Sequence, residues 1–198
     1  DDKTDGTLKT LLKDRNILPH PLATGDVLSV RTKGGKLEFS TLWPPRCTLE
    51  KSDNDTQISS AEAEDTRKHF RFAATRCSQL DANDGSLSGV VKYGRLQTLF
   101  TGDISTKTEI AMVAASLLPD IDILKVSHHG SKTSTSTELL QMARPETAII
   151  SVGAGNSYGH PDPSVVDRLR SQNIKVLLTS IDGSIHIVSD GNHYWVKK

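Results

Sequence analysis

The residues best able to do chemistry stand at the ends of three predicted strands. The pair His128-His129 follows the apolar run 123–126, Asp103 follows the run 96–100, and His160 follows the run 148–152. Neutral imidazole is the commonest metal ligand and can also move protons near neutral pH. If the three strands are also neighbours in one sheet, their carboxyl ends meet at one edge, where α/β proteins bind ligands.

An aspartate and two or three histidines at one edge would form a metal site of oxygen and nitrogen donors. Such a site polarises a phosphoryl or carbonyl oxygen and lowers the pKa of bound water to about 7. Each motif also has a purely structural interpretation, because Gly-Asp is a common turn, serines cap helices, and a histidine before proline can order its loop. The hypothesis therefore depends on the three motifs occurring together.

The elements that must position these residues alternate between strand and helix after residue 87. This pattern favours an α/β or layered α+β domain with helices packed on a sheet. A β-hairpin is predicted around Gly94-Arg95, with another closing the chain. The patterns predict strands at 27–30, 37–40, 87–93, 96–100, 123–126, 147–152, 176–179, 184–188 and 193–196, and helices at 7–15, 109–118, 138–143 and 164–170.

Length and composition fit one well-cored domain spanning residues 1–198, with a polar insertion at 50–68 that we expect to be flexible. The 24 basic and 24 acidic residues balance, so no global charge attracts nucleic acid or membrane. No apolar run approaches the roughly 18 residues of a membrane span. Cys47 and Cys77 could form a disulfide in an oxidising compartment, or be two unrelated buried thiols.

Three motifs together resemble the second half of a metallo-β-lactamase-fold hydrolase of the ComEC type. These domains occur at the C-terminus of the bacterial DNA-uptake channel and in free-standing relatives. The similar stretches are Thr101-Gly102-Asp103, Leu124 to Ser131 and Ile150 to Pro161, with Asn83 to Leu87 fitting the pattern upstream. The resemblance is strong from about residue 81 to 190 and implies an αββα sandwich.

The resemblance also implies site residues and cofactors. Asp103 would bridge two divalent ions, zinc or manganese. One of His128 and His129 would be a metal ligand and the other would contact phosphate or transfer a proton; which does which stays open. His160 would be a further ligand or substrate contact. Ser131 and Asn156 would line the cleft and bind substrate.

The resemblance further implies that the chain hydrolyses phosphodiesters. Its substrate would be DNA, either single-stranded or the strand that is degraded. The parent membrane channel would be the partner, on the outer face of the cell membrane; a cytoplasmic free-standing relative is the alternative.

One part of the family pattern is missing. The motif His-x-His-x-Asp-His normally comes first, and no His-x-His occurs in this sequence. We therefore expect a chain that starts just downstream of that motif and lacks the N-terminal strands of the fold. Two alternatives remain open: a catalytically degenerate binding or assembly domain, and a small-molecule esterase or lactonase on the same fold.

Overall fold

A computed structural model describes residues 22–45 and 80–197 of the chain. The predicted helix at 7–15, the insertion at 50–68 and both cysteines lie outside the described residues. Within the described ranges, none of the helices has the length and apolar character needed to cross a lipid bilayer. The described strands and helices are β1 (Val27–Thr32), β2 (Gly35–Trp43), β3 (Ser88–Tyr93), β4 (Leu96–Phe100), α2 (Thr106–Ala114), β5 (Ile123–Lys125), η3 (Ser127–Gly130), α3 (Thr137–Ala143), β6 (Thr147–Ile150), α4 (Pro163–Ser171), β7 (Lys175–Leu178), α5 (Thr179–Asp182), β8 (His186–Ser189) and β9 (Tyr194–Lys197).

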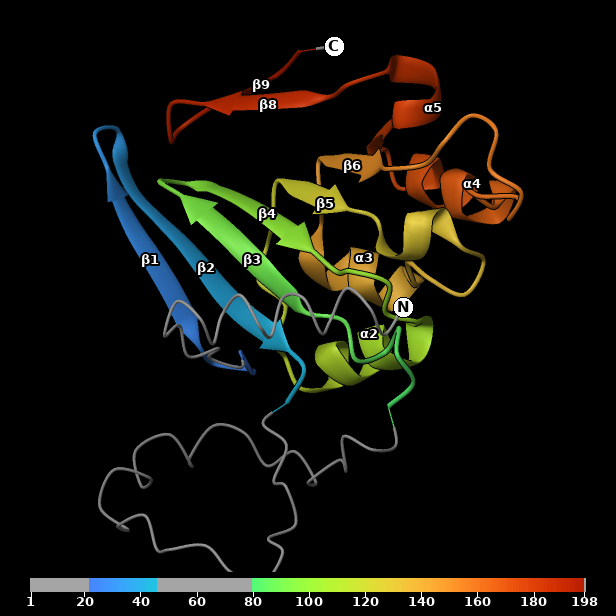
Figure 1. The fold of residues 1–198 in the computed structure, drawn as a ribbon, viewed down its shortest axis with the longest axis horizontal. Coiled ribbons are helices and arrows are strands. Elements are labelled where there is room, and N and C mark those ends of the chain that lie inside the picture. Colours follow the sequence, from blue (N-terminus) through green and yellow to red (C-terminus); the bar gives the residue numbers. More distant parts are fainter. Residues whose placement is uncertain (1–21, 46–79, 198) are drawn as a thin grey trace, which may run out of the picture.

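The strands form a seven-stranded sheet in chain order, β1 to β7, and a separate β8–β9 hairpin (Figure 1). The first four strands pair antiparallel, whereas β4, β5, β6 and β7 pair parallel to one another. Parallel pairing requires a crossover between strands, and helices α2, α3 and α4 lie in the three crossovers. The carboxyl ends of four consecutive strands therefore lie at the same edge.

The core lies between one face of the sheet and the three crossover helices. Leu99, Leu124 and Ala148 come from three adjacent strands, and all are essentially inaccessible to solvent. The helices contribute apolar side chains to the same cluster: Met112 from α2, Leu139, Leu140 and Ala143 from α3, and Val165 and Leu169 from α4. This packing fixes the strand ends relative to the helices, as expected for a layered α/β fold.

The elements predicted within the described ranges are all present, and their ends differ most at β2, where the strand predicted at 37–40 spans Gly35–Trp43, and at α2. The helix predicted at 109–118 covers Thr106–Ala114, because the chain reverses at Ser116, with φ of 54°, and delivers Leu117 and Leu118 to the core. The short helix α5 was not predicted, and the predicted strand at 176–179 ends one residue earlier.

A buried carboxylate joins helix α2 to the loop that follows the histidine pair. Glu109 is fully buried, and its two oxygens accept hydrogen bonds from the backbone N–H groups of Thr135 (2.7 Å) and Ser136 (2.6 Å). Burial raises the pKa of Glu109 above its usual value, although these N–H groups act in the opposite direction. Arg168 of α4 donates to the carbonyls of Ser134 and Thr135 in the same loop.

We predict that Glu109→Met lowers the free energy of unfolding by about 2–5 kcal/mol. Methionine keeps most of the side-chain volume but leaves two buried N–H groups without an acceptor, at about 1–3 kcal/mol each. Urea unfolding followed by circular dichroism measures the change. Glu138→Met is the matched control: Glu138 is exposed on α3, so its loss should cost no more than about 0.5 kcal/mol. Equal effects of the two substitutions would contradict the assigned role of Glu109.

Candidate active site

The structure brings the three predicted motifs together at the carboxyl edge of the parallel strands. Asp103 follows β4, His128 and His129 follow β5, and the loop carrying His160 follows β6. The expectation that their strands are neighbours in the sheet is therefore confirmed.

The Gly-Asp turn after β4 is held by backbone hydrogen bonds. Gly102 has φ of 58°, and a Cβ atom there would lie 2.6 Å from the Cβ of Ser86, so a larger residue does not fit. The Ser86 hydroxyl accepts a hydrogen bond from the Asp103 N–H (3.1 Å). The Gly102 carbonyl accepts one from the His128 N–H (3.1 Å), which ties the aspartate turn to the histidine pair.

A second carboxylate, Asp84, holds the chain just after this turn. It is buried, and its Oδ1 accepts a hydrogen bond from the Ser105 N–H at the start of α2 (2.8 Å). Its backbone carbonyl accepts one from the Trp43 indole (2.6 Å). Burial alone would raise the pKa of Asp84, but hydrogen bonds from Ser105 and Thr108 and the charge of Lys107 hold it below its usual value.

The histidine pair occupies a left-handed backbone conformation. Within the short 3₁₀ segment η3, His128 has φ 46° and His129 has φ 55°, and Gly130 continues at 80°. Two consecutive non-glycine residues in this region are uncommon and carry a conformational cost, which persists where surrounding contacts impose it and is often found at functional sites.

The position of the ring proton on His129 follows from its hydrogen bond. Nδ1 lies 2.7 Å from the carbonyl oxygen of Ser151, which can only accept, so Nδ1 carries a proton. In the neutral ring, Nε2 then has a free lone pair. That nitrogen faces Asp103, with Nε2 and Oδ1 3.8 Å apart.

Asp103 and His129 fit two positions of a divalent cation site. Their separation is near the roughly 3.4 Å between two ligands of one tetrahedral ion with bonds of about 2.0–2.1 Å. A histidine ligand commonly donates its other ring N–H to a backbone carbonyl, as His129 does to Ser151. Across residues 22–45 and 80–197, however, no three His, Cys, Asp or Glu side chains gather into a metal-binding group. The described residues thus supply part of a ligand set.

His128 and His160 lie together beside His129. The rings of His128 and His160 meet edge to face, with centroids 5.8 Å apart. Gly130 permits this approach: a Cβ there would lie 2.7 Å from the Cβ of Pro161. The Gly130 carbonyl also accepts a hydrogen bond from the Asp162 N–H, which joins the two loops (2.8 Å).

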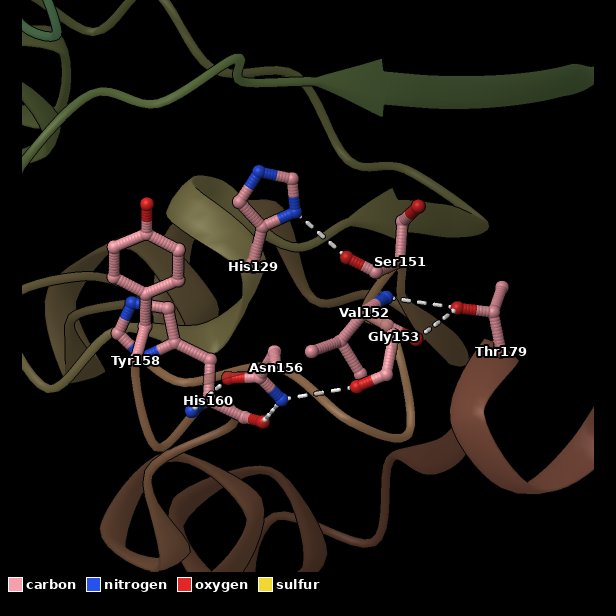
Figure 2. A pocket seen from close by; sticks show the side chains of 8 residues that line it. All are labelled: His129, Ser151, Val152, Gly153, Asn156, Tyr158, His160 and Thr179. Carbon is pink, nitrogen blue, oxygen red and sulfur yellow. Dashed lines mark hydrogen bonds between the residues drawn. The ribbon is translucent and has the colours of Figure 1, made fainter.

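A pocket of about 460 Å³ opens at this edge (Figure 2). Its lining comes from η3, the loop after β6 and the start of α5, and consists of His129, Ser151, Val152, Gly153, Asn156, Tyr158, His160 and Thr179. The Thr179 hydroxyl accepts from the Val152 N–H and donates to the Val152 carbonyl, closing the base of the loop.

The two residues predicted to bind substrate are engaged with their own loops. The Asn156 amide donates to the carbonyls of Gly153 and His160 and accepts the His160 N–H (3.0 Å), so it holds the His160 loop in shape. Ser131 is buried outside the pocket lining, with its hydroxyl 3.2 Å from that of Thr133. Both still contact a histidine of the site through hydrogen bonds, Asn156 with the His160 backbone and the Ser131 N–H with the His128 carbonyl.

Sequence reasoning gave no role to a cation beside the site, Lys125. It is half-buried on β5, opposite Phe100 in the sheet, and its ammonium donates to the Val126 carbonyl (3.0 Å). Burial lowers the pKa of Lys125, and the negative charge of Asp103 acts in the opposite direction. The sequence signal that could have pointed to Lys125 is that it is the charged residue in the otherwise apolar run 123–126.

Comparison with known proteins agrees with this geometry. Residues 80–154 match the model of the metallo-β-lactamase superfamily. This segment belongs to that superfamily. The matched metallo-β-lactamase segment contains Asp103, His128, His129 and the strands that position them.

About half of this chain is similar to parts of three bacterial proteins. They are ComE operon protein 3 of Bacillus subtilis (40% identity over 105 residues), Recombination protein 2 of Haemophilus influenzae (41% over 105) and Competence protein ComA of Neisseria gonorrhoeae (37% over 109). The alignments cover 52%, 53% and 54% of this chain but 13%, 13% and 16% of the relatives. These similarities support the ComEC-type resemblance that the motifs carried, and the chain aligns with only a small part of each relative.

We predict that Asp84→Asn reduces stability at neutral pH and that this deficit shrinks as the pH falls below about 4. Because the pKa of Asp84 is lower in the folded state, its charge contributes stability above its unfolded value near 4, and this is lost as the pH falls through the folded value. Urea midpoints between pH 7 and pH 3 measure the effect. Asp167→Asn, at an exposed position on α4, should leave the pH profile unchanged. A deficit independent of pH would refute the prediction.

We predict that Gly130→Ala destabilises the protein by about 1–3 kcal/mol, because alanine is strained at this positive φ and its methyl group collides with Pro161. Gly153→Ala, in the neighbouring loop, meets no atom within 4 Å and should change stability by less than about 0.5 kcal/mol. Thermal unfolding compares the two variants, and similar melting temperatures would contradict the close approach of the loops.

Proposed function

We propose that this chain is part of a metal-dependent phosphodiesterase that acts on DNA. The observation that supports this most directly is the Asp103 carboxylate facing Nε2 of His129 across 3.8 Å, at the common end of three parallel strands. The hydrogen bond from Nδ1 to Ser151 orients that imidazole toward the carboxylate. A carboxylate and an oriented imidazole suit zinc or manganese, the ions expected from the superfamily.

Asp103 and His129 would hold the metal, and Asp103 could bridge two ions. A bound divalent ion lowers the pKa of a coordinated water and neutralises phosphate charge. About three or four protein ligands per ion are usual, so two ions need more donors than the described residues provide. The sequence contains no His-x-His-x-Asp-His motif, and the remaining ligands would come from outside the described residues.

The other side chains would handle the phosphate and the proton. His128 and His160 lie in contact beside His129, where an imidazole could donate a hydrogen bond to a phosphate oxygen or protonate the leaving oxygen. Lys125, when protonated, would add a positive charge near Asp103. Asn156 would act mainly by shaping the loop that presents His160, and Ser131 by supporting the backbone after the pair.

The names of the relatives suggest the biological setting. One relative is named for competence, one for the ComE operon and one for recombination, and these names support a role in a membrane-associated system for DNA uptake. We place the domain on the outer face of the membrane through its parent protein, with a cytoplasmic location as the alternative.

A catalytically degenerate binding or assembly domain is the second candidate. The observation that favours it is that the described residues contain no complete group of metal ligands. Such a domain would retain the strand-end arrangement and bind DNA without cleaving it. A small-molecule esterase or lactonase would instead hydrolyse carboxylic esters in the same pocket.

We predict that Asp103→Ala and His129→Ala each reduce metal-dependent phosphodiester hydrolysis by at least about 100-fold, because each removes a donor to the metal. Hydrolysis of bis(p-nitrophenyl) phosphate and of an oligonucleotide with added Mn²⁺ or Zn²⁺ measures the rate, in the full-length parent protein if this chain alone is inactive. His186→Ala, at an exposed position on β8, is the control and should match the wild type.

Three outcomes separate the candidates. Activity that survives in both site variants would overturn the assignment of Asp103 and His129. A parent protein that binds DNA but cleaves no phosphodiester would favour the degenerate domain. Hydrolysis of p-nitrophenyl acetate or a lactone, without phosphodiester cleavage, would favour the small-molecule esterase.

A further inference from the structure

An aromatic side chain stands exposed at the edge of the candidate active site. Tyr158 lines the pocket, yet 82% of its surface is accessible to solvent (Figure 2). Among the described residues, none hydrogen-bonds its hydroxyl group. Exposing an aromatic ring gives up the free energy that its burial would provide, and neither core packing nor a hydrogen bond explains its place in the loop.

The orientation of the ring is defined by the residues next to it. Tyr158 stacks on His160, with ring centroids 6.1 Å apart and an interplanar angle of 20°. His160 is held in turn by the Asn156 amide, which bonds both its N–H and its carbonyl. The aromatic ring is therefore held on a loop fixed by hydrogen bonds, and His160 is in ring contact with both Tyr158 and His128.

This arrangement places a flat apolar surface beside groups that suit a phosphate. His129 and His160 line the same pocket as Tyr158, and Asp103 faces His129. In a polynucleotide, each phosphate is joined to nucleosides whose bases are flat and apolar on both faces. Proteins that bind single strands commonly stack such bases on exposed aromatic side chains beside a site for the backbone.

We propose that Tyr158 is a stacking platform for a nucleobase next to the phosphate held at the histidine cluster, and that it selects single-stranded nucleic acid. This inference rests on the proposed phosphodiesterase function and identifies a specificity residue for it. A base inside a duplex is already stacked on its neighbours, so it reaches the tyrosine only at the cost of unpairing. Stacking is tolerant of base identity, so discrimination among the four bases should be weak.

The test compares two variants on substrates with and without bases. The substrates are a single-stranded oligothymidylate and an abasic oligonucleotide of the same length, assayed with Mn²⁺ under the conditions that give activity. Tyr158→Leu should lower kcat/KM for oligothymidylate about five- to tenfold, mainly through KM, because stacking on one base contributes about 1–3 kcal/mol. Its kcat/KM for the abasic strand should stay within about twofold of the wild type.

Tyr158→Phe keeps the aromatic face and should behave like the wild type on both substrates. Trp195→Leu removes an aromatic side chain that is half exposed on β9, outside the pocket, and controls for a general loss of surface aromatics. A duplex of the same sequence should be a poorer substrate than the single strand for the wild type, and this preference should shrink in Tyr158→Leu.

An equal loss on the abasic and base-bearing strands would overturn the proposal and show instead that Tyr158 only supports His160. A loss in Tyr158→Phe as large as in Tyr158→Leu would also overturn it. If the wild type cleaves no phosphodiester, the proposed function fails. Fluorescence anisotropy with the same two strands then tests separately whether Tyr158 stacks on a base. Preferential binding of the base-bearing strand, lost in Tyr158→Leu, would support the platform, and equal binding of both strands would overturn it.

Discussion

Parallel pairing of β4, β5 and β6 is the constraint on which the candidate site depends. Residues far apart in sequence can meet there only because three consecutive strands run in the same direction and end at the same edge. Helices α2 and α3 make this possible by returning the chain across one face of the sheet, and their buried side chains hold the strands in register. The antiparallel strands β1 to β3 extend the sheet but contribute no histidine to the site.

The turns at that edge are held by side chains bonded to backbone groups. Asp84, Ser86 and Glu109 each accept at least one backbone N–H, and Asn156 bonds the backbone on both sides of its loop. Such bonds meet the hydrogen-bonding needs of irregular backbone that regular secondary structure cannot meet. They also explain how two consecutive histidines can stay in a left-handed conformation, since the neighbouring turns are fixed independently of them.

The strand pattern and the order of the motifs made the fold and the position of the site predictable. The apolar runs that precede Asp103 and His128 are local signals for strands. The helices between these strands indicate that the strands are parallel neighbours. The proton position on His129 was not predictable, because it depends on the Ser151 carbonyl, twenty-two residues away. Asn156 lines the pocket as expected, but the hydrogen bonds of Asn156 and Ser131 to nearby loop groups were not predictable, because they depend on turn geometry that residue type alone does not specify.

The buried link between Glu109 and the 134–136 loop has a consequence for cooperativity. The N–H groups of Thr135 and Ser136 lie in an irregular segment, where amide hydrogens usually exchange with solvent through small local openings. Here their acceptor is a carboxylate from a different helix, inside the core. Opening this segment therefore exposes a buried carboxylate of α2, so the loop beside the histidine pair should open together with α2 rather than by itself.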